Sequence, residues 1–251
     1  VNPEFLKNDI SYIEDSNEYW RPWHENSFII GKYPDSTLLG IPVITNENFV
    51  KNSLEYLTGK DINDCIYPEY DSTQAKTIKI PTPDSIYIRL LHQSDNFIAE
   101  QLMLMCSYTL FDTISTKMAI EWSKENLLPG LKDNCRWVDG SGLSRYNLFS
   151  PSDMIYVLNN IYNTIGLERI KVLFPTAGHS GTLKNSYKNI KTPYLWAKSG
   201  SLSNNYNLSG FIKTRKGNLY IFSFMNNHFL AKNKDIKAEM EKVFEYIYNQ
   251  L

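Results

Sequence analysis

Cysteine and histidine are scarce in this sequence, and their spacing argues against two common kinds of site. The three cysteines, Cys65, Cys106 and Cys135, are odd in number and widely spaced. They therefore predict neither a disulfide framework nor a paired-thiol metal site. The four histidines include no pair at the spacing of helical metal ligands, so no zinc site is expected. Cys106 follows the apolar run 102–105, and we expect it to be a small core residue.

Long hydrophobic runs and an excess of charge of either sign are also lacking. No stretch reaches the roughly 18 apolar residues that a membrane-spanning helix needs. The N-terminus has no basic region followed by an apolar stretch, the pattern of a signal peptide. With 26 basic and 27 acidic side chains the net charge is −1, which provides no general attraction to nucleic acid or anionic lipid. We therefore expect no membrane span and no nucleic-acid partner.

The remaining composition and patterning indicate a globular α+β protein. An apolar share of 42% and a charged share of 21% are ordinary for that class. Residues 1–41 are polar, aromatic and turn-rich, with too little apolar periodicity to form a domain by themselves. The patterns after them run as helices, then an antiparallel meander, then a closing helix, which predicts an antiparallel sheet flanked by helices. Helices are expected at 45–59, 84–93, 96–110, from 150 onward and at 233–250, strands at 27–31, 76–80, 197–201, 209–214 and 219–225, and turns at 33–36 and 215–218.

Three short segments concentrate polar residues in contexts that suggest chemistry. Ser94-Asp95-Asn96 lies between two predicted helices, Asp139–Ser144 is a glycine-rich loop, and Lys198–Ser201 begins a predicted strand. Each has an ordinary structural interpretation as well: a helix cap, a tight turn and a strand end. The pattern Ser-x-Asn also recurs at 203–205. None of the three decides the function by itself.

Their order and spacing are more specific. Ser-Asp-Asn and Lys-Thr-Gly are signatures of penicillin-binding proteins and class A β-lactamases, and here Ser94 precedes Lys198-Ser-Gly by 104 residues. Between them, residues 139–151 strongly resemble the D-alanyl-D-alanine carboxypeptidase/endopeptidase family, which comprises the low-molecular-mass class C penicillin-binding proteins (peptidase family S13). The resemblance runs from about Pro42 to Asn227 and includes the segments 177–184, 197–203 and 208–211.

Two features depart from the pattern of that family. Ser199 replaces the commoner threonine and keeps the hydroxyl group. The nucleophile signature Ser-x-x-Lys occurs nowhere in the chain; in the family it lies near the N-terminus, upstream of inserted accessory domains. We therefore expect residues 1–41 to be the remnant of an inserted accessory domain. Residues 42–251 would form the C-terminal part of a transpeptidase-like domain with the penicillin-binding/serine β-lactamase fold, incomplete at its N-terminal side.

The resemblance also implies roles for individual residues. Ser94 would carry the proton toward the leaving D-alanine, and the amide of Asn96 would bind the substrate's peptide carbonyl. Lys198 and the hydroxyl group of Ser199 would bind the terminal carboxylate of the substrate. Gly200 would leave room for substrate beside the strand, and the backbone N–H of Ser201 would be one oxyanion donor. The loop that contains Asp139 and Ser141 would frame the cleft without taking part in a catalytic step.

The implied ligands are peptidoglycan stem peptides ending in D-Ala-D-Ala and β-lactams, in an extracytoplasmic, periplasmic location, with no cofactor. The missing N-terminal part of the same protein would be a further partner, and this chain alone is expected to be inactive. The balance between carboxypeptidase and endopeptidase activity stays open. So does a non-catalytic module that binds peptidoglycan peptides or a partner, which an upstream Ser-x-x-Lys would exclude. A different serine hydrolase built on Ser141 or Ser180 is disfavoured, because neither serine lies in a Gly-x-Ser-x-Gly turn.

Overall fold

The computed structural model divides the chain into two units, residues 1–78 and 79–251. It describes residues 3–32, 40–63, 81–131 and 135–251. Cys65 and the features predicted at 33–36 and 76–80 lie outside these residues. The predicted domain boundary after residue 41 falls within the first unit and stays a prediction. Each unit is described by itself.

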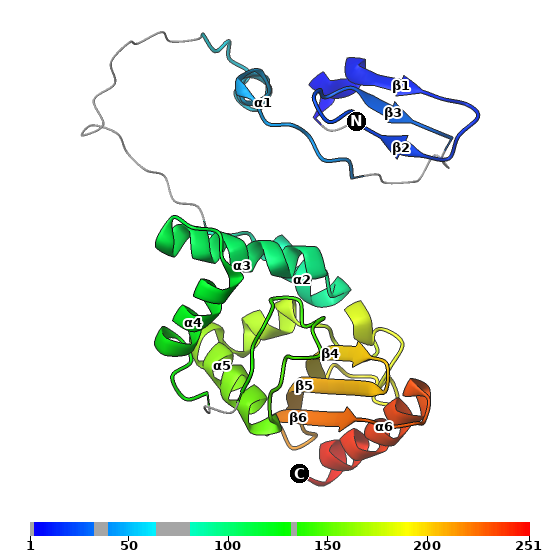
Figure 1. The fold of residues 1–251 in the computed structure, drawn as a ribbon. Helices are drawn as coiled ribbons and strands as arrows, with labels where there is room; N and C mark the ends of the chain where they lie inside the picture. Colours follow the sequence, from blue (N-terminus) through cyan, green and yellow to red (C-terminus); the bar gives the residue numbers. More distant parts are fainter. Residues whose placement is uncertain (1–2, 33–39, 64–80, 132–134) are drawn as a thin grey trace. The chain divides into compact units, whose positions relative to one another are not determined.

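The first unit contains a small sheet of order β1-β3-β2 next to the 3-10 helix η1 (Glu4–Asp9) (Figure 1). Strand β3 (Phe28–Ile30) runs parallel to β1 (Ile10–Tyr12) and antiparallel to β2 (Tyr19–Trp20). The strand expected at 27–31 is thus confirmed, whereas β1 and β2 were not predicted. Both are too short to show an alternating pattern.

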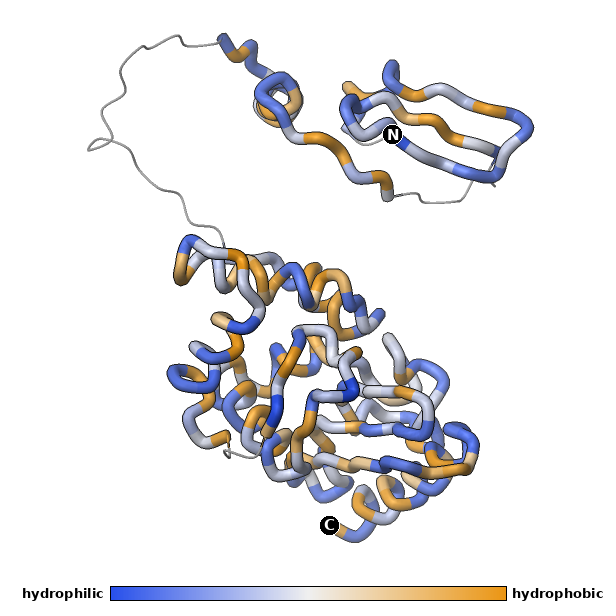
Figure 2. The backbone as a smooth tube through the Cα atoms, viewed as in Figure 1, coloured by the Kyte–Doolittle hydropathy of each residue, from blue (hydrophilic) through white to orange (hydrophobic). Residues whose placement is uncertain are grey.

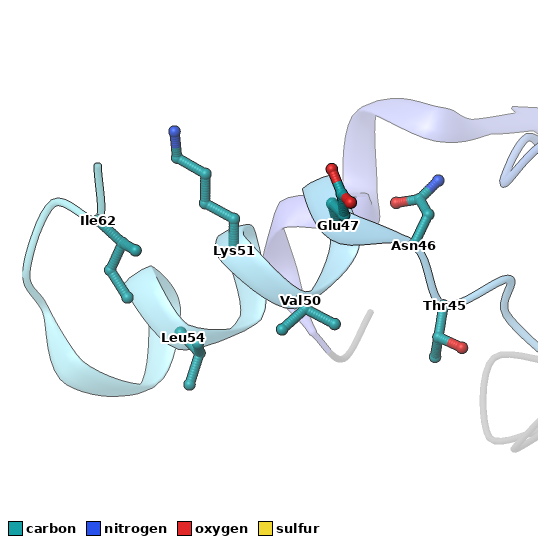
Figure 3. Close-up of a pocket in the computed structure, with 7 residues that line it drawn as sticks. All are labelled: Thr45, Asn46, Glu47, Val50, Lys51, Leu54 and Ile62. Carbon is teal, nitrogen blue, oxygen red and sulfur yellow. The ribbon is translucent and has the colours of Figure 1, made fainter. Parts of the chain in front are cut away.

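Helix α1 (Glu47–Thr58) follows in the same unit and confirms the helix expected at 45–59. The Asn46 side chain caps it by accepting the Phe49 N–H at 2.8 Å, and Gly59, at φ 64°, ends it. In Figure 3, Val50 and Leu54 point to one side of the helix and Lys51 to the other. These residues line a hollow of about 520 Å³. It contains none of the residues of the three polar segments.

The second unit begins with four helices. Helix α4 (Thr116–Asn126) was not predicted, whereas α2 (Asp84–Gln93), α3 (Asn96–Phe111) and α5 (Pro151–Leu173) agree with the sequence pattern. The side chain of Ser150 and the side chain of Asp153 cap each other's backbone N–H at the start of α5, and Gly166, at φ 70°, kinks that helix.

An antiparallel sheet of order β4-β5-β6 follows, consisting of β4 (Leu195–Leu202), β5 (Asn205–Lys213) and β6 (Leu219–Asn227). The three strands confirm those expected from the sequence and are longer at most ends. The turn between β5 and β6 includes Gly217 at φ 96°, a conformation that glycine adopts without strain. Helix α6 (Asn233–Gln250) closes the chain, and Figure 2 shows hydrophobic and hydrophilic residues alternating along it.

Alternate residues of each strand point to opposite sides of the sheet. Both faces carry buried apolar side chains, and each face is covered by helices. On one face, Leu195, Ala197 and Leu208 pack with Met240 and Phe244 of α6. On the other face, the core comprises Trp196, Phe211 and the α5 residues Leu158, Ile170 and Leu173, against which residues of α2 pack. The predicted antiparallel sheet flanked by helices is therefore confirmed.

Helix α3 corrects one expectation about the core. Cys106 is exposed, as are Met105 and Tyr108, while the neighbouring Ser107 is fully buried. Apolar residues occur all round this helix, so its residue pattern contains no periodic signal of which face is covered. Among the described residues, none of the helices combines the length and the hydrophobicity of a membrane-spanning segment.

Candidate functional site

Ser94 lies at the junction between α2 and α3, in an unusual backbone conformation. Its φ of 54° places it in the left-handed region, and its N–H donates to the Leu90 carbonyl to end α2. A non-glycine residue in this region costs on the order of 1 kcal/mol, and such residues are concentrated at functional sites. The sharp turn allows α3 to begin two residues later.

Asp95 is the N-cap of α3, as the ordinary structural interpretation of this segment expected. Its carboxylate accepts the Ile98 N–H at 3.1 Å and the Arg89 Nε–H at 3.0 Å. The backbone bond from Ile98, followed by the hydrogen bond from Arg89, lowers the pKa of Asp95 below its usual range. Asn96 is the first residue of α3 and is exposed. Its side-chain amide makes no hydrogen bond within the described part of the chain.

Lys198 joins the first and third polar segments. From β4 its Nζ donates to Ser94 Oγ at 2.7 Å and to the Ser199 carbonyl at 2.6 Å. The two side chains are 104 residues apart in the sequence. Burial lowers the pKa of Lys198 to about 8, because desolvation disfavours the charged ammonium. The tertiary fold therefore places a half-buried ammonium group directly against the hydroxyl group of Ser94.

The segment Ser199–Ser201 continues along the outer edge of the sheet. The N–H of Ala197 donates to the Pro175 carbonyl across that edge at 3.0 Å. N–H groups of alternate strand residues point the same way, so those of Ser199 and Ser201 also point outward. A Cβ built on Gly200 would meet no atom within 4 Å, so the backbone there faces open space. The edge thus offers N–H donors beside an unobstructed backbone.

The loop at residues 139–147 is organised by the carboxylate of Asp139. This carboxylate accepts N–H groups of Gly142 at 2.6 Å and Ser144 at 2.8 Å, and the amide of Asn147 at 2.9 Å. Backbone hydrogen bonds between Arg136 and Leu148 close the base of the loop. The polar side chains at its centre are therefore used to fix the conformation of the loop.

Glu100 holds the same loop against α3. Its carboxylate accepts the N–H of Ser141 at 2.9 Å and that of Gly140 at 3.3 Å. The contact requires glycine at 140, because a Cβ there would lie 2.8 Å from the Ala99 carbonyl oxygen. Glu100 lies one helical turn beyond Asn96, so Asp139 and Ser141 are positioned beside the start of α3. Within the described residues, neither Asp139 nor Ser141 makes a hydrogen bond with Ser94 or Lys198.

Several residues around this site were not predicted from the sequence. Glu100 could have been found from its position four residues after Asn96 on the same helix face. Thr182 accepts a hydrogen bond from Ser199 Oγ at 3.1 Å and lies within the family-like segment 177–184. No pattern in the sequence indicated that Asn233 donates to Ser201 Oγ at 3.0 Å. Nor did any indicate that Arg145 donates to the Ser203 carbonyl at 3.3 Å.

The chain is similar to a known family of penicillin-recognising peptidases over most of its length. The sequence profile of the D-Ala-D-Ala carboxypeptidase 3 (S13) family matches residues 75–246, well over half of the chain. The chain belongs to this family. It is 29% identical over 198 residues to the D-alanyl-D-alanine carboxypeptidase DacB of Haemophilus influenzae, covering 73% of this chain and 40% of that protein. It is also 36% identical over 109 residues to penicillin-sensitive carboxypeptidase A of Dictyostelium discoideum, covering 39% of this chain and 20% of that protein.

Solved structures show the same fold. Penicillin-binding protein 4 (dacB) of Haemophilus influenzae, complexed with a novel β-lactam, matches with a TM-score of 0.59 and 26% identity. The match covers 66% of this chain and 41% of that structure. A second structure of the Haemophilus protein gives a TM-score of 0.58 at 24% identity. The expected penicillin-binding fold is therefore confirmed, and the chain spans about 40% of the length of its DacB relative.

Proposed function

We propose that the whole protein containing this segment is a serine-type D-Ala-D-Ala carboxypeptidase of peptidoglycan peptides, sensitive to β-lactams and located outside the cytoplasm. The observation that carries this proposal is the 2.7 Å hydrogen bond between Lys198 Nζ and Ser94 Oγ. It unites two of the three signatures of penicillin-recognising enzymes. It also provides the chemistry that such an enzyme needs on one side of its substrate.

Ser94 is suited to move a proton during acyl transfer. A serine hydroxyl both donates and accepts, and here Lys198 already donates to its oxygen. The hydroxyl proton of Ser94 is then available to the leaving D-alanine amine, while its oxygen accepts a proton from the nucleophile side. Asn96, exposed at the start of α3, offers an amide N–H to the peptide carbonyl of the substrate.

Lys198 is suited to bind the terminal carboxylate. An ammonium group has three N–H donors, and two of those of Lys198 are used by Ser94 and the Ser199 carbonyl. Within the described residues the third has no partner and can make a charge-assisted hydrogen bond to a carboxylate. The Ser199 hydroxyl is a second donor. The outward N–H of Ser201 supports a role in stabilising the oxyanion, and open space at Gly200 admits the substrate chain.

The nucleophile belongs to the rest of the proposed enzyme, because Ser-x-x-Lys does not occur in these 251 residues. The segment alone therefore has a proton path and a carboxylate site without a serine positioned to be acylated. A non-catalytic peptide-binding module would use the same carboxylate site. The two functions differ in whether the whole protein forms an acyl-enzyme.

The deciding experiment is Lys198→Ala in the whole protein, with acylation measured by a fluorescent penicillin and D-alanine release measured on a D-Ala-D-Ala peptide. We expect loss of both activities, because the carboxylate loses its cationic partner and Ser94 loses its donor. Lys213→Ala, at the exposed end of β5, is the matched control and should retain both. Undiminished acylation of Lys198→Ala would sink the assignment, and a wild-type protein that is never acylated would favour the binding module.

A companion measurement uses the 251-residue chain by itself. Incubation with penicillin followed by intact-mass spectrometry should show no covalent adduct, because the chain lacks the Ser-x-x-Lys nucleophile. A stable adduct would refute this division of roles and would direct attention to Ser94 as a nucleophile.

A further inference from the structure

We propose that Thr182 is a positioning residue that fixes the hydroxyl group of Ser199 for binding the terminal carboxylate of the substrate. Neither the sequence signatures nor the family comparison assigns it a role. The inference rests on the proposed function, because it deepens the carboxylate site of Lys198 and Ser199. It starts from a direct contact, in which Ser199 Oγ donates to Thr182 Oγ1 at 3.1 Å.

Thr182 reaches Ser199 because of the shape of the turn that carries it. It lies in the 3-10 helix η2 (Gly181–Leu183), whose last residue is fully buried in the core and anchors the turn. Gly181, at φ 56°, allows this turn to approach α2, since a Cβ there would lie 2.9 Å from His92 Cα. His92 is two residues before Ser94. The turn therefore lies beside the end of α2 while Thr182 contacts β4.

Ser199 needs such a partner because it is not β-branched. Threonine, the commoner residue in this signature, has a second heavy atom on Cβ that restricts its side-chain rotamers. Serine lacks that restriction, and its hydroxyl can turn among the staggered positions. The hydrogen bond to Thr182 selects one of them. Thr182 thus supplies the rotational restriction that threonine would provide at position 199.

The contact can also strengthen Ser199 as a donor. When a carboxylate binds, the Ser199 proton turns to it, and the Ser199 oxygen becomes free to accept the proton of Thr182. Hydrogen bonds arranged in such a chain polarise one another. Thr182 is exposed, so its hydroxyl can reorient during this exchange. Lys198 contributes the charge, Ser199 the direct hydroxyl donor, and Thr182 the orientation of that donor.

The test measures binding of N-acetyl-D-Ala-D-Ala and of its C-terminal amide to the 251-residue chain by NMR titration of backbone amides. The ratio of the two dissociation constants reports recognition of the carboxylate and is insensitive to general loss of structure. Thr182→Val removes the hydroxyl while keeping the shape of the side chain. We expect it to reduce the preference for the free acid by about 3- to 10-fold, the effect of one hydrogen bond. Thr182→Ser should retain the preference, as should the control Thr192→Val, since the Thr192 hydroxyl group lies beside Tyr248 of α6.

A double-mutant cycle identifies the mechanism. In a Ser199→Thr background, where the second branch restricts the rotamer, Thr182→Val should reduce the preference by less than about twofold. Equal losses in both backgrounds, or an unchanged preference in Thr182→Val alone, would overturn the inference about Thr182. Failure of the proposed function looks different: the wild-type chain would show no preference for the free acid, or Lys198→Ala would keep it.

Discussion

The two sides of the candidate site are held in place by different forces. On the strand side, Lys198 and Ser199 directly follow Trp196 and Ala197, which are buried in opposite faces of the sheet. On the loop side, residues 139–147 are held by hydrogen bonds to the carboxylates of Asp139 and Glu100. The position of the strand therefore depends on the hydrophobic core, whereas that of the loop depends on a few polar contacts.

This difference indicates how each side responds to change. A defect in the core below β4 lowers the stability of the whole second unit, because buried apolar contacts are shared among several elements. A defect in the loop contacts releases one segment while the sheet stays folded, since local opening needs less free energy than global unfolding. Variants of the two sides should therefore separate global stability from local order.

The largest effect is expected from Phe211→Ala, which removes a fully buried ring of β5 that packs against Phe174 and Tyr162. The loss of burial and the resulting cavity should lower the free energy of unfolding by about 3–5 kcal/mol, measured by urea denaturation. Leu143→Ala, on the exposed part of the loop, is the matched control and should change it by less than about 0.5 kcal/mol. Similar values for both variants would show that the core does not support the strand side preferentially.

A smaller and local effect is expected from Asp139→Asn. The neutral amide has one oxygen acceptor in place of two, so it cannot accept hydrogen bonds from Gly142, Ser144 and Asn147 together. We expect a local cost of about 1–3 kcal/mol, seen as faster hydrogen exchange of the Gly142 and Ser144 amides. Asp112→Asn, at the end of α3, is the control. Faster exchange throughout β4 and β5 would contradict a loop that opens independently.

The smallest effect concerns pH and involves the strand side alone. Since burial lowers the pKa of Lys198 to about 8, its ammonium is charged below that pH and loses its charge above it. The substrate carboxylate stays ionised throughout, so affinity for N-acetyl-D-Ala-D-Ala should decrease as the pH rises. From about pH 7 to about pH 9 the expected loss is roughly tenfold, or ~1.4 kcal/mol. Affinity that stays constant over this range would contradict the lowered pKa, and the C-terminal amide serves as the control ligand.

Much of this fold could be predicted because its signals are local. The short apolar runs in β4, β5 and β6, the cap at Ser150 and the terminating Gly59 each depend on neighbouring residues. Helix α4 was missed, and Cys106 was wrongly expected to be buried, because covering a helix face depends on what packs against it. The sequence also could not show that Ser94 adopts a left-handed conformation. Serine rarely does so without support from its surroundings.

The sequence by itself determined most of the helices and strands, the family signatures and the residue types available for chemistry. Only the tertiary structure decided which of them meet: Lys198 with Ser94, Ser199 with Thr182, and Ser141 with Glu100. The physical reason is the separation along the sequence over which each feature is determined. Helix and strand patterns arise over a few residues, whereas these contacts join residues that are distant in the sequence and depend on packing the sheet against its helices.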